Sequence, residues 1–151
     1  MYWHYITFLA AAVFTLSTAT AMTYCPPRPA SLFEQRAIFD AFVEAFYVEG
    51  NVTGPVIQYV AVYYIQHNSF ILSGRAAGIA ALSVPGPATT PTIVHQLYDG
   101  NIGSVHHKDI AAGSPLMAVA DYYRFDGSCI IGHWDVTQPF TANATNPLAL
   151  F

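Results

Sequence analysis

Residues 116–137 read LMAVADYYRFDGSCIIGHWDVT, and this stretch decides the fold. Two runs rich in aromatic and β-branched residues, Leu116 to Phe125 and Cys129 to Thr137, flank the turn signal Asp126-Gly127-Ser128. Such runs around an Asp-Gly pair are typical of a β-hairpin. The stretch therefore predicts two neighbouring antiparallel strands.

A second hairpin is predicted directly before the first. The runs Thr92 to Tyr98 and Ile102 to Lys108 are separated by Asp99-Gly100-Asn101, which is again a hairpin signal. The second half of the chain is therefore expected to form an antiparallel meander of four strands.

Helices are predicted ahead of these strands. Ser31 and Glu34 form a capping box that opens a first helix, which runs to Glu49 and stops at Gly50. A second helix begins at Thr53 and Pro55 and carries a stripe of Val56, Tyr59, Val60 and Tyr63. A third helix spans Arg75 to Leu82 and ends at the Pro85-Gly86-Pro87 loop. Helices followed by an antiparallel meander indicate the α+β class.

Composition narrows the class of protein. The chain has 151 residues, which fit one domain, and 54% of them are hydrophobic while only 9% are charged. This balance excludes an intrinsically disordered chain. The formal net charge of −4 provides no basic stripe for phosphates, so we expect no nucleic-acid partner.

The N-terminal residues have the pattern of a secretory signal. An apolar run from Tyr5 to Leu16 is followed by Ala19-Thr20-Ala21, whose small side chains suit a signal-peptidase site. The run is shorter than the ~20 apolar residues that a membrane anchor needs. We expect residues 1–21 to be a signal peptide, residues 22–30 to be an extended lead-in, and the protein to be secreted.

Two further features fit an oxidising, extracellular compartment. Cys25 and Cys129 are the only cysteines, and they are interpreted either as a disulfide or as two unpaired thiols. Asn51 and Asn143 begin N-glycosylation sequons, so a glycoprotein is expected.

Alternation along the last two strands gathers the ionisable side chains. Asp121 shares a face with Tyr123, and His133 shares a face with Asp135 on the neighbouring strand. The hairpin turn brings the two sets together. Since the opposite face of the last strand is also apolar, we expect helices to cover one face and a second subunit of a homodimer to cover the other.

Acids and a histidine in phase among apolar residues favour an acid/base site, because an enclosed environment tunes such groups for proton transfer. An isolated Asp would instead be an ion-paired carboxylate, with Arg75, Lys108 or Arg124 as its partner. The remaining histidines, each taken alone, are typical of hydrogen-bonded structural residues; they are His67, His95, His106 and His107.

A metal site is the third reading of the same residues. His133 and Asp135 form a His-x-Asp pair, the local part of a two-His, one-carboxylate site, for which His67 or His107 would supply the further ligand. No spacing in the sequence fixes that geometry, so we expect neither a metal nor a cofactor. The sequence contains no Gly-x-Ser-x-Gly motif of a serine hydrolase.

Several segments in order along the chain resemble the SnoaL-like polyketide cyclase family. They are Tyr64-Ile65-Gln66-His67-Asn68 with Gly74-Arg75, Tyr98-Asp99-Gly100-Asn101 with Val105-His106, Ala120 to Gly127, His133 to Pro139, and Asn146-Pro147 with Phe151. The strand-turn-strand block that ends in His-Trp-Asp is the most specific of them. The resemblance covers a domain at residues 31–151.

The resemblance implies the nuclear transport factor two-like (NTF2-like) fold, in which a cone-shaped curved antiparallel sheet packs against N-terminal helices and encloses a pocket. In the characterised cyclases an Asp just after the His-Trp pair acts as acid/base in an aldol ring closure without a metal or cofactor. The matching residue here is Asp135. Those cyclases have a His where this chain has Asp121, so the substrate is expected to differ.

We expect Asp135 to remove a proton α to a carbonyl group, while His133, His67 or a Tyr hydroxyl donates to the enolate oxygen. Asp121 would orient a histidine or share a proton. The ligand would be a small apolar or carbonyl-containing metabolite, such as a polyketide, contacted by His67, His107, Tyr123 and Tyr64. The alternatives are a non-catalytic binding module of the same fold and, third, a metal-dependent enzyme.

Overall fold

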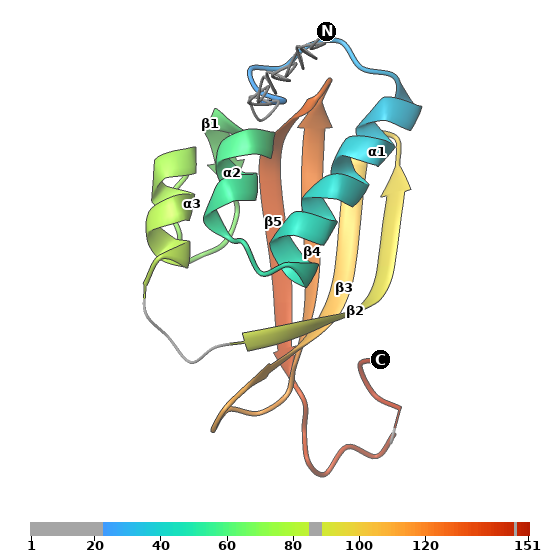
Figure 1. The fold of residues 1–151 in the computed structure, drawn as a ribbon. Coiled ribbons are helices and arrows are strands. Elements are labelled where there is room, and N and C mark those ends of the chain that lie inside the picture. Colours follow the sequence, from blue (N-terminus) through green and yellow to red (C-terminus); the bar gives the residue numbers. More distant parts are fainter. Residues whose placement is uncertain (1–22, 85–88, 147) are drawn as a thin grey trace, which may run out of the picture.

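The computed structural model describes residues 23–84, 89–146 and 148–151. In chain order, and as drawn in Figure 1, the elements are α1 (Leu32–Val43), the π-helical turn η1 (Glu44–Val48), α2 (Thr53–Tyr59), β1 (Val60–Gln66), α3 (Arg75–Leu82), β2 (Thr89–Asp99), β3 (Ile102–Ala111), β4 (Met117–Asp126) and β5 (Cys129–Pro139). The predicted signal peptide lies outside the described residues. Within them, no helix is long and apolar enough to cross a membrane.

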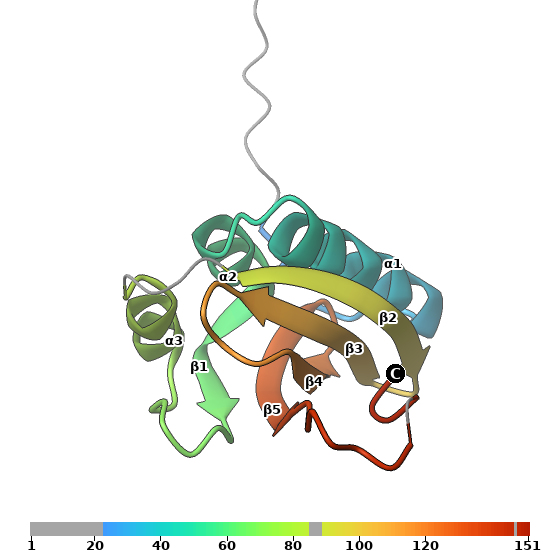
Figure 2. The same ribbon diagram turned by 90° about the horizontal axis from the view of Figure 1, so that it is seen from below.

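The five strands form one curved sheet in the order β1-β5-β4-β3-β2. The two predicted hairpins are confirmed, since β2 pairs antiparallel with β3 and β4 pairs antiparallel with β5. Gly100 and Gly127 sit in the two turns with positive φ, the conformation that favours glycine. Seen from below in Figure 2, the sheet is curved, with α1 and α2 along its concave side and α3 beside β1. The α+β fold with helices against a curved sheet is thus as predicted.

The second helix is shorter than the sequence pattern predicted. It ends at Tyr59, and Val60 already has extended backbone angles. Residues 60–66 are VAVYYIQ, a β-branched and aromatic run that forms β1 and pairs parallel with β5. The spacing of Val56, Tyr59, Val60 and Tyr63 fits a helix, but pairing with β5 places the residues from Val60 onward in a strand. The sheet is therefore mixed, with a fifth strand that was not predicted.

The start of α1 follows the predicted cap. The Ser31 hydroxyl accepts a hydrogen bond from the Glu34 backbone N–H at 3.2 Å. After Val43 the helix widens into η1, which is one π-helical turn. Such turns insert one residue into a helix and are frequent at functional sites. The turn leaves Tyr47 buried.

The core between the helices and the sheet is aromatic. Phe39 and Phe42 on α1 are fully buried, and their rings pack against Tyr123 and Phe125 of β4. Gly103 on β3 leaves room for the Phe39 ring, because a Cβ at this position would lie 2.6 Å from it. The helices are therefore held on the inner face of the sheet by close ring packing.

The lead-in segment runs without helix or strand from Thr23 to Ala30 and is fastened to the β4-β5 hairpin. Cys25 and Cys129 are joined by a disulfide, with their Cα atoms 5.2 Å apart. The Ser128 hydroxyl donates to the Tyr24 carbonyl at 2.5 Å, and the Ser128 N–H donates to the Arg28 carbonyl at 3.0 Å. The chain is thus crosslinked over 104 residues.

Replacing both cysteines by serine should lower the free energy of unfolding by about 4 kcal/mol, because the unfolded chain loses the constraint of a very long loop. Chemical denaturation measures the loss. As a control, dithiothreitol should destabilise the unsubstituted protein by a similar amount and leave the double variant unchanged. A double variant as stable as the oxidised protein would contradict the assignment.

Candidate functional site

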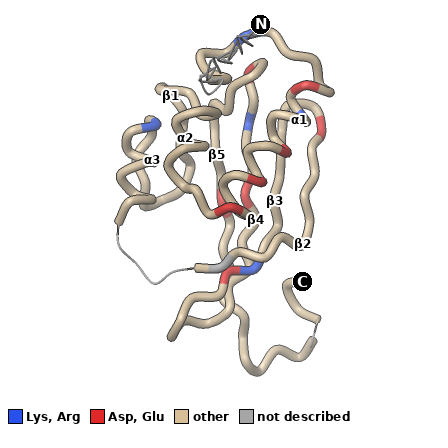
Figure 3. The backbone as a smooth tube through the Cα atoms, viewed as in Figure 1, with Lys and Arg blue, Asp and Glu red and all other residues tan. Residues whose placement is uncertain are grey.

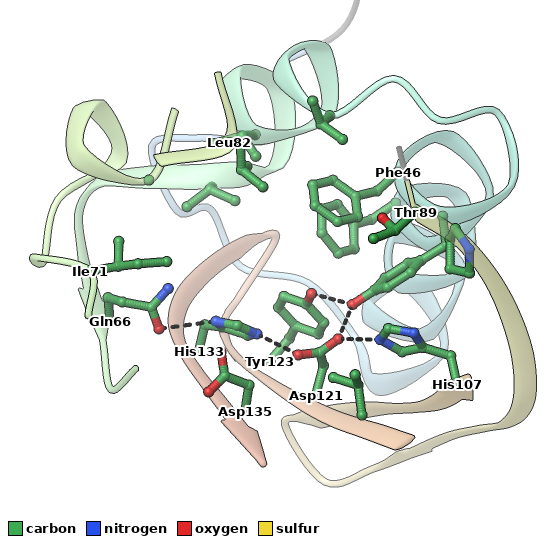
Figure 4. Close-up of a pocket in the computed structure, with 18 of the residues that line it drawn as sticks. Phe46, Gln66, Ile71, Leu82, Thr89, His107, Asp121, Tyr123, His133 and Asp135 are labelled. Carbon is green, nitrogen blue, oxygen red and sulfur yellow. Dashed lines mark hydrogen bonds and ion pairs between the residues drawn. The ribbon is translucent and has the colours of Figure 1, made fainter. Parts of the chain in front are cut away.

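A cavity of about 420 Å³ lies between the helices and the inner face of the sheet. Its walls are largely apolar and aromatic, with Phe42, Phe46, Val56, Val60, Ile71, Leu82 and Val119 among them. Figure 4 shows Phe46 and Leu82 across the cavity from Asp121 and His133. The volume lies in the range of small-molecule sites.

Strand alternation brings the predicted polar residues to this cavity. In the β4-β5 ladder Asp121 lies directly opposite Asp135, and Tyr123 lies opposite His133. All four residues line the cavity, and so do His107 and Tyr64. The structure therefore gathers six of the seven residues for which the sequence predicted a catalytic or ligand-binding role.

Asp121 is the centre of a buried hydrogen-bond network. Its carboxylate accepts hydrogen bonds from His107 Nε2 at 2.9 Å, from His133 Nε2 at 3.0 Å and from the Tyr47 hydroxyl at 2.5 Å. Burial alone would raise the pKa of Asp121, but the hydrogen bonds from the two histidines and Tyr47, with the charge of His133, lower it to about 2. Asp121 is therefore a fixed negative charge at neutral pH.

His107 bridges Asp121 to a second carboxylate. Its Nδ1 lies 2.7 Å from Asp109 Oδ1, and both ring nitrogens thus face carboxylate oxygens. Burial would lower the pKa of His107, but hydrogen bonds to Asp109 and Asp121, and their charges, raise it to about 9. His107 is accordingly an imidazolium ion at neutral pH, donating from both nitrogens.

Two tyrosines extend the network into the core. Because the Tyr47 hydroxyl donates to Asp121, it accepts from the Tyr123 hydroxyl, which lies 2.5 Å away. Burial, together with the negative charge of Asp121, raises the pKa of both tyrosines well above the usual value, so both stay protonated. The π-helical turn η1 supplies this contact, since Tyr47 belongs to it.

The end of β1 supplies two residues that the sequence reasoning did not select. Gln66 lies beside His133 in the parallel ladder, and its Oε1 lies 3.0 Å from His133 Nδ1. The Asn68 backbone N–H also donates to this oxygen, which fixes the orientation of the amide, so Gln66 accepts from His133. Figure 4 shows the resulting line from Gln66 through His133 and Asp121 to His107. The Gln-His-Asn segment was noted in the sequence, but only parallel pairing with β5 reveals which of its residues face the site.

Asp135 is held differently from Asp121. It is half-buried at the cavity wall, and its one side-chain hydrogen bond within the described residues comes from Asn68 Nδ2 to Oδ2, at 2.6 Å. Its Oδ1 is not engaged by a described side chain. Asp135 thus has an oxygen left for a ligand, and it lies on the same side of the cavity as His133.

Tyr64 on β1 places a hydroxyl group at the cavity wall that, like Oδ1 of Asp135, has no partner among the described residues. Its side chain is buried at the cavity wall, and its OH forms no hydrogen bond with any described residue. Burial raises the pKa of Tyr64, and the negative charges of Asp135 and Asp121 raise it further. Tyr64 therefore remains a protonated donor near Asp135.

His67 does not belong to the cavity, contrary to the sequence-based hypothesis. It is exposed and stacks on Trp134, with the ring centroids 4.2 Å apart. The Arg124 guanidinium also lies over the Trp134 ring, with its carbon 5.5 Å from the ring centroid. The reason is strand alternation: His133 and Asp135 point inward, so Trp134 between them points outward and His67 stacks there. The sequon residues Asn51 and Asn143 are both exposed.

The metal hypothesis has a definite geometry to test. Ligand atoms of Asp121, His133 and Asp135 all lie within 4.8 Å of one another. The hydrogen bond between Asp121 and His133 already occupies the atoms that these two residues would turn to an ion. The arrangement is accounted for by hydrogen bonding, and elemental analysis after metal supplementation tests the alternative.

No family model and no curated protein sequence matches the chain significantly. Solved structures do match. A candidate ketosteroid isomerase from Kribbella flavida superposes with a TM-score of 0.64 at 12% identity, over 79% of this chain and 88% of the other. A candidate polyketide cyclase from Acidithiobacillus ferrooxidans gives a TM-score of 0.53 at 21% identity, over 69% and 87% of the two chains.

An epoxide hydrolase of the LEH-like type from M. tuberculosis matches with a TM-score of 0.54 at 18% identity, over 70% of this chain and 84% of the other. Further matches are NTF2-like proteins of unknown function. These likenesses confirm the NTF2-like fold to which the resemblance with the SnoaL-like cyclases pointed. At such identities they show the fold alone.

The network predicts how stability depends on pH. The folded pKa of Asp121 lies below its ordinary value of 3.8, so its contribution is present above about pH 4 and is lost as the pH falls toward 2. The folded pKa of His107 lies above its ordinary 6.5, so its contribution is full below that pH and is lost as the pH rises through about 9. Urea denaturation across this range should show the free energy of unfolding falling on both sides, by up to about 3 kcal/mol on the alkaline side.

The variant His107→Gln is the matched control, because glutamine can hydrogen-bond but does not titrate. It should be less stable at pH 6 and should lack most of the decline between pH 6.5 and 9. An unchanged alkaline decline in this variant would show that another group causes it.

Proposed function

We propose that the cavity catalyses acid/base chemistry on a small carbonyl compound, with Asp135 as the base and Tyr64 as the hydrogen-bond donor. One observation carries the proposal. Asp135 and Tyr64 both line the cavity with reactive atoms that the network leaves unoccupied, and they are close enough for the charge of Asp135 to raise the pKa of Tyr64. A base and an electrophilic donor facing one apolar space are what enolate formation needs.

In the proposed step, Asp135 takes the proton from the carbon α to the carbonyl group. The electron pair of that C–H bond forms the enolate, and the negative charge that develops on oxygen accepts a hydrogen bond from Tyr64. Attack of the enolate carbon on a second carbonyl of the same molecule forms a C–C bond and moves the electron pair of that carbonyl's π bond to its oxygen. The proton held by Asp135 then passes to this alkoxide, which gives the aldol product and restores the base. Return of the proton from Asp135 to another carbon of the conjugated system gives an isomerisation instead.

The network around Asp121 has a supporting role in this scheme. Both ring nitrogens of His133 are engaged, one with Gln66 and one with Asp121, so His133 positions the wall of the site rather than donating to the enolate. With its three hydrogen bonds, Asp121 keeps this wall rigid and gives it charge. The donor among the predicted alternatives is therefore Tyr64.

A non-catalytic binding module is the second candidate. The specific observation in its favour is the wall opposite the polar groups, where Phe46, Leu82 and their neighbours offer an apolar surface to any ligand of suitable size. Turnover distinguishes the two functions, since a module would bind the ligand and release it unchanged.

Secretion is part of the proposal as well. The disulfide between Cys25 and Cys129 fits the oxidising compartment that the N-terminal signal pattern implies. A disulfide crosslink and exposed sequons at Asn51 and Asn143 are features of proteins that pass through a secretory pathway.

The variant Asp135→Asn should lower the rate of α-proton exchange of a bicyclic ketone by about 10² to 10⁴, because asparagine keeps the shape of the side chain and cannot accept the proton. Exchange of 2-tetralone or 2-acetylnaphthalene in D2O, followed by NMR, provides the measurement. The matched control is Asp126→Asn, an exposed acid in the β4-β5 turn. Equal exchange rates for the Asp135 variant and the unsubstituted protein would refute the assignment of the base.

The variant Tyr64→Phe should lower the same exchange rate by about 10² to 10³, since it removes one donor to the developing oxyanion. The control is Tyr63→Phe. Tyr63 directly precedes Tyr64 in β1, is 61% exposed and does not line the cavity. The Tyr64 variant should retain most of its affinity for the ketone, because the hydrogen bond strengthens only in the transition state.

A further inference from the structure

Carboxylates outnumber cations around the cavity. Asp109, Asp121 and Asp135 line it, and no Lys or Arg does so. Figure 3 shows acidic positions along β3, β4 and β5, with one basic position directly beside an acidic one on β3. This basic residue is Lys108, which precedes Asp109 and does not line the cavity. The imidazolium of His107 in this wall is bound between Asp109 and Asp121, so it offers no free donor to an anion that enters.

Each basic side chain of the protein is engaged elsewhere. Arg28 and Arg36 form ion pairs with acids of α1, at Glu34 and Asp40. Arg75 donates to the backbone carbonyls of Ile57 and Val60.

The two remaining basic residues pack on aromatic rings outside the cavity. The Lys108 ammonium lies 4.8 Å from the centre of the Phe151 ring, and Arg124 lies over Trp134. The alternative considered for an isolated Asp, an ion pair with Arg75, Lys108 or Arg124, is not formed among the described residues.

The two histidines at the wall have no ring nitrogen free to donate to an anion. His107 directs one nitrogen to Asp109 and the other to Asp121. His133 directs one nitrogen to Gln66 and the other to Asp121. An anionic ligand would have to break one of these bonds to gain a charged donor, and would lose its hydration in an apolar space at the same time.

From this arrangement we propose that the cavity selects its ligand by charge: it binds apolar molecules that are uncharged or cationic and rejects the corresponding carboxylates. A carboxyl group in the natural substrate would then be masked, as in an ester, amide or lactone. This inference rests on the proposed function for the identity of the site and adds the class of substrate to it.

A matched pair of probes tests the proposal at pH 7.5. Naphthalene-2-carboxamide and 2-naphthoate have the same shape and differ by one negative charge. Calorimetric titration should give a dissociation constant for the carboxylate that is at least about tenfold weaker than that for the amide, because repulsion across a poorly hydrated space exceeds that in water. Equal affinities within a factor of three, or tighter binding of the carboxylate, would overturn the proposal, and so would the absence of binding by the amide.

Adding a cation to the wall provides the reciprocal test. Thr89 lines the cavity at the start of β2 and is exposed. In Figure 4 it lies on the side of the cavity away from Gln66. Thr89→Lys should tighten the binding of 2-naphthoate by about tenfold and change that of the amide little. Thr89→Gln, which adds length without charge, should leave the ratio as it is in the unsubstituted protein. No gain for the carboxylate in the lysine variant would count against wall charge as the cause of the selectivity.

The outcome is separable from that of the proposed reaction. A ketone such as 2-acetylnaphthalene that binds but exchanges no protons would refute the acid/base function and leave charge selectivity standing. Exchange of the ketone together with equally tight binding of the carboxylate would confirm the function and refute the selectivity.

Discussion

A carboxylate buried among aromatic residues is stable only if enough donors replace its lost hydration. In this protein that group is Asp121, which is 6% exposed and accepts hydrogen bonds from two histidines and a tyrosine. The donors come from η1, β3 and β5, so the requirement ties a helical turn to two strands of the sheet. The geometry of the cavity wall depends on this one requirement, because moving any of the three elements leaves a buried charge without a partner.

The same requirement divides the two aspartates that face each other across β4 and β5. Asp121 uses its oxygens on protein donors and is held in its charged form. Asp135 has a single donor, Asn68, and keeps an oxygen for the cavity. Two carboxylates in register on adjacent strands thus have different chemistry, one structural and one available, because their environments differ.

The hairpins, the third helix and the shared face of Asp121, His133 and Asp135 followed from the sequence, because each depends on neighbouring residues or on alternation within one strand. The parallel strand β1 did not follow, since residues 56–63 fit a helical stripe and only contact with the distant β5 selects the strand. Gln66 and Asn68 were not selected as site residues for the same reason, because their positions depend on the pairing of β1 with β5. His67, for which a ligand contact was predicted, lies outside the cavity.

The face of β4 and β5 that points away from the cavity also carries large side chains. Tyr122 and Val136 are exposed there, and the predicted second subunit stays a prediction. The aromatic stack of His67, Trp134 and Arg124 lies on this side as well. The two faces of β5 therefore differ: the inner face carries the residues of the proposed proton chemistry, and the outer face carries the aromatic stack.

The π-helical turn sets the direction in which Tyr47 points relative to the part of the helix that precedes it. An α-helix advances about 100° per residue, so removing one residue from positions 44–48 would rotate Tyr47 by roughly that angle if the remaining residues closed into an ordinary helix. Phe39 and Phe42, fixed in the core before the turn, would keep their places. A one-residue change in length would thus act as a twist, turning the phenol away from the acid it serves while leaving the packed half of the same helix undisturbed.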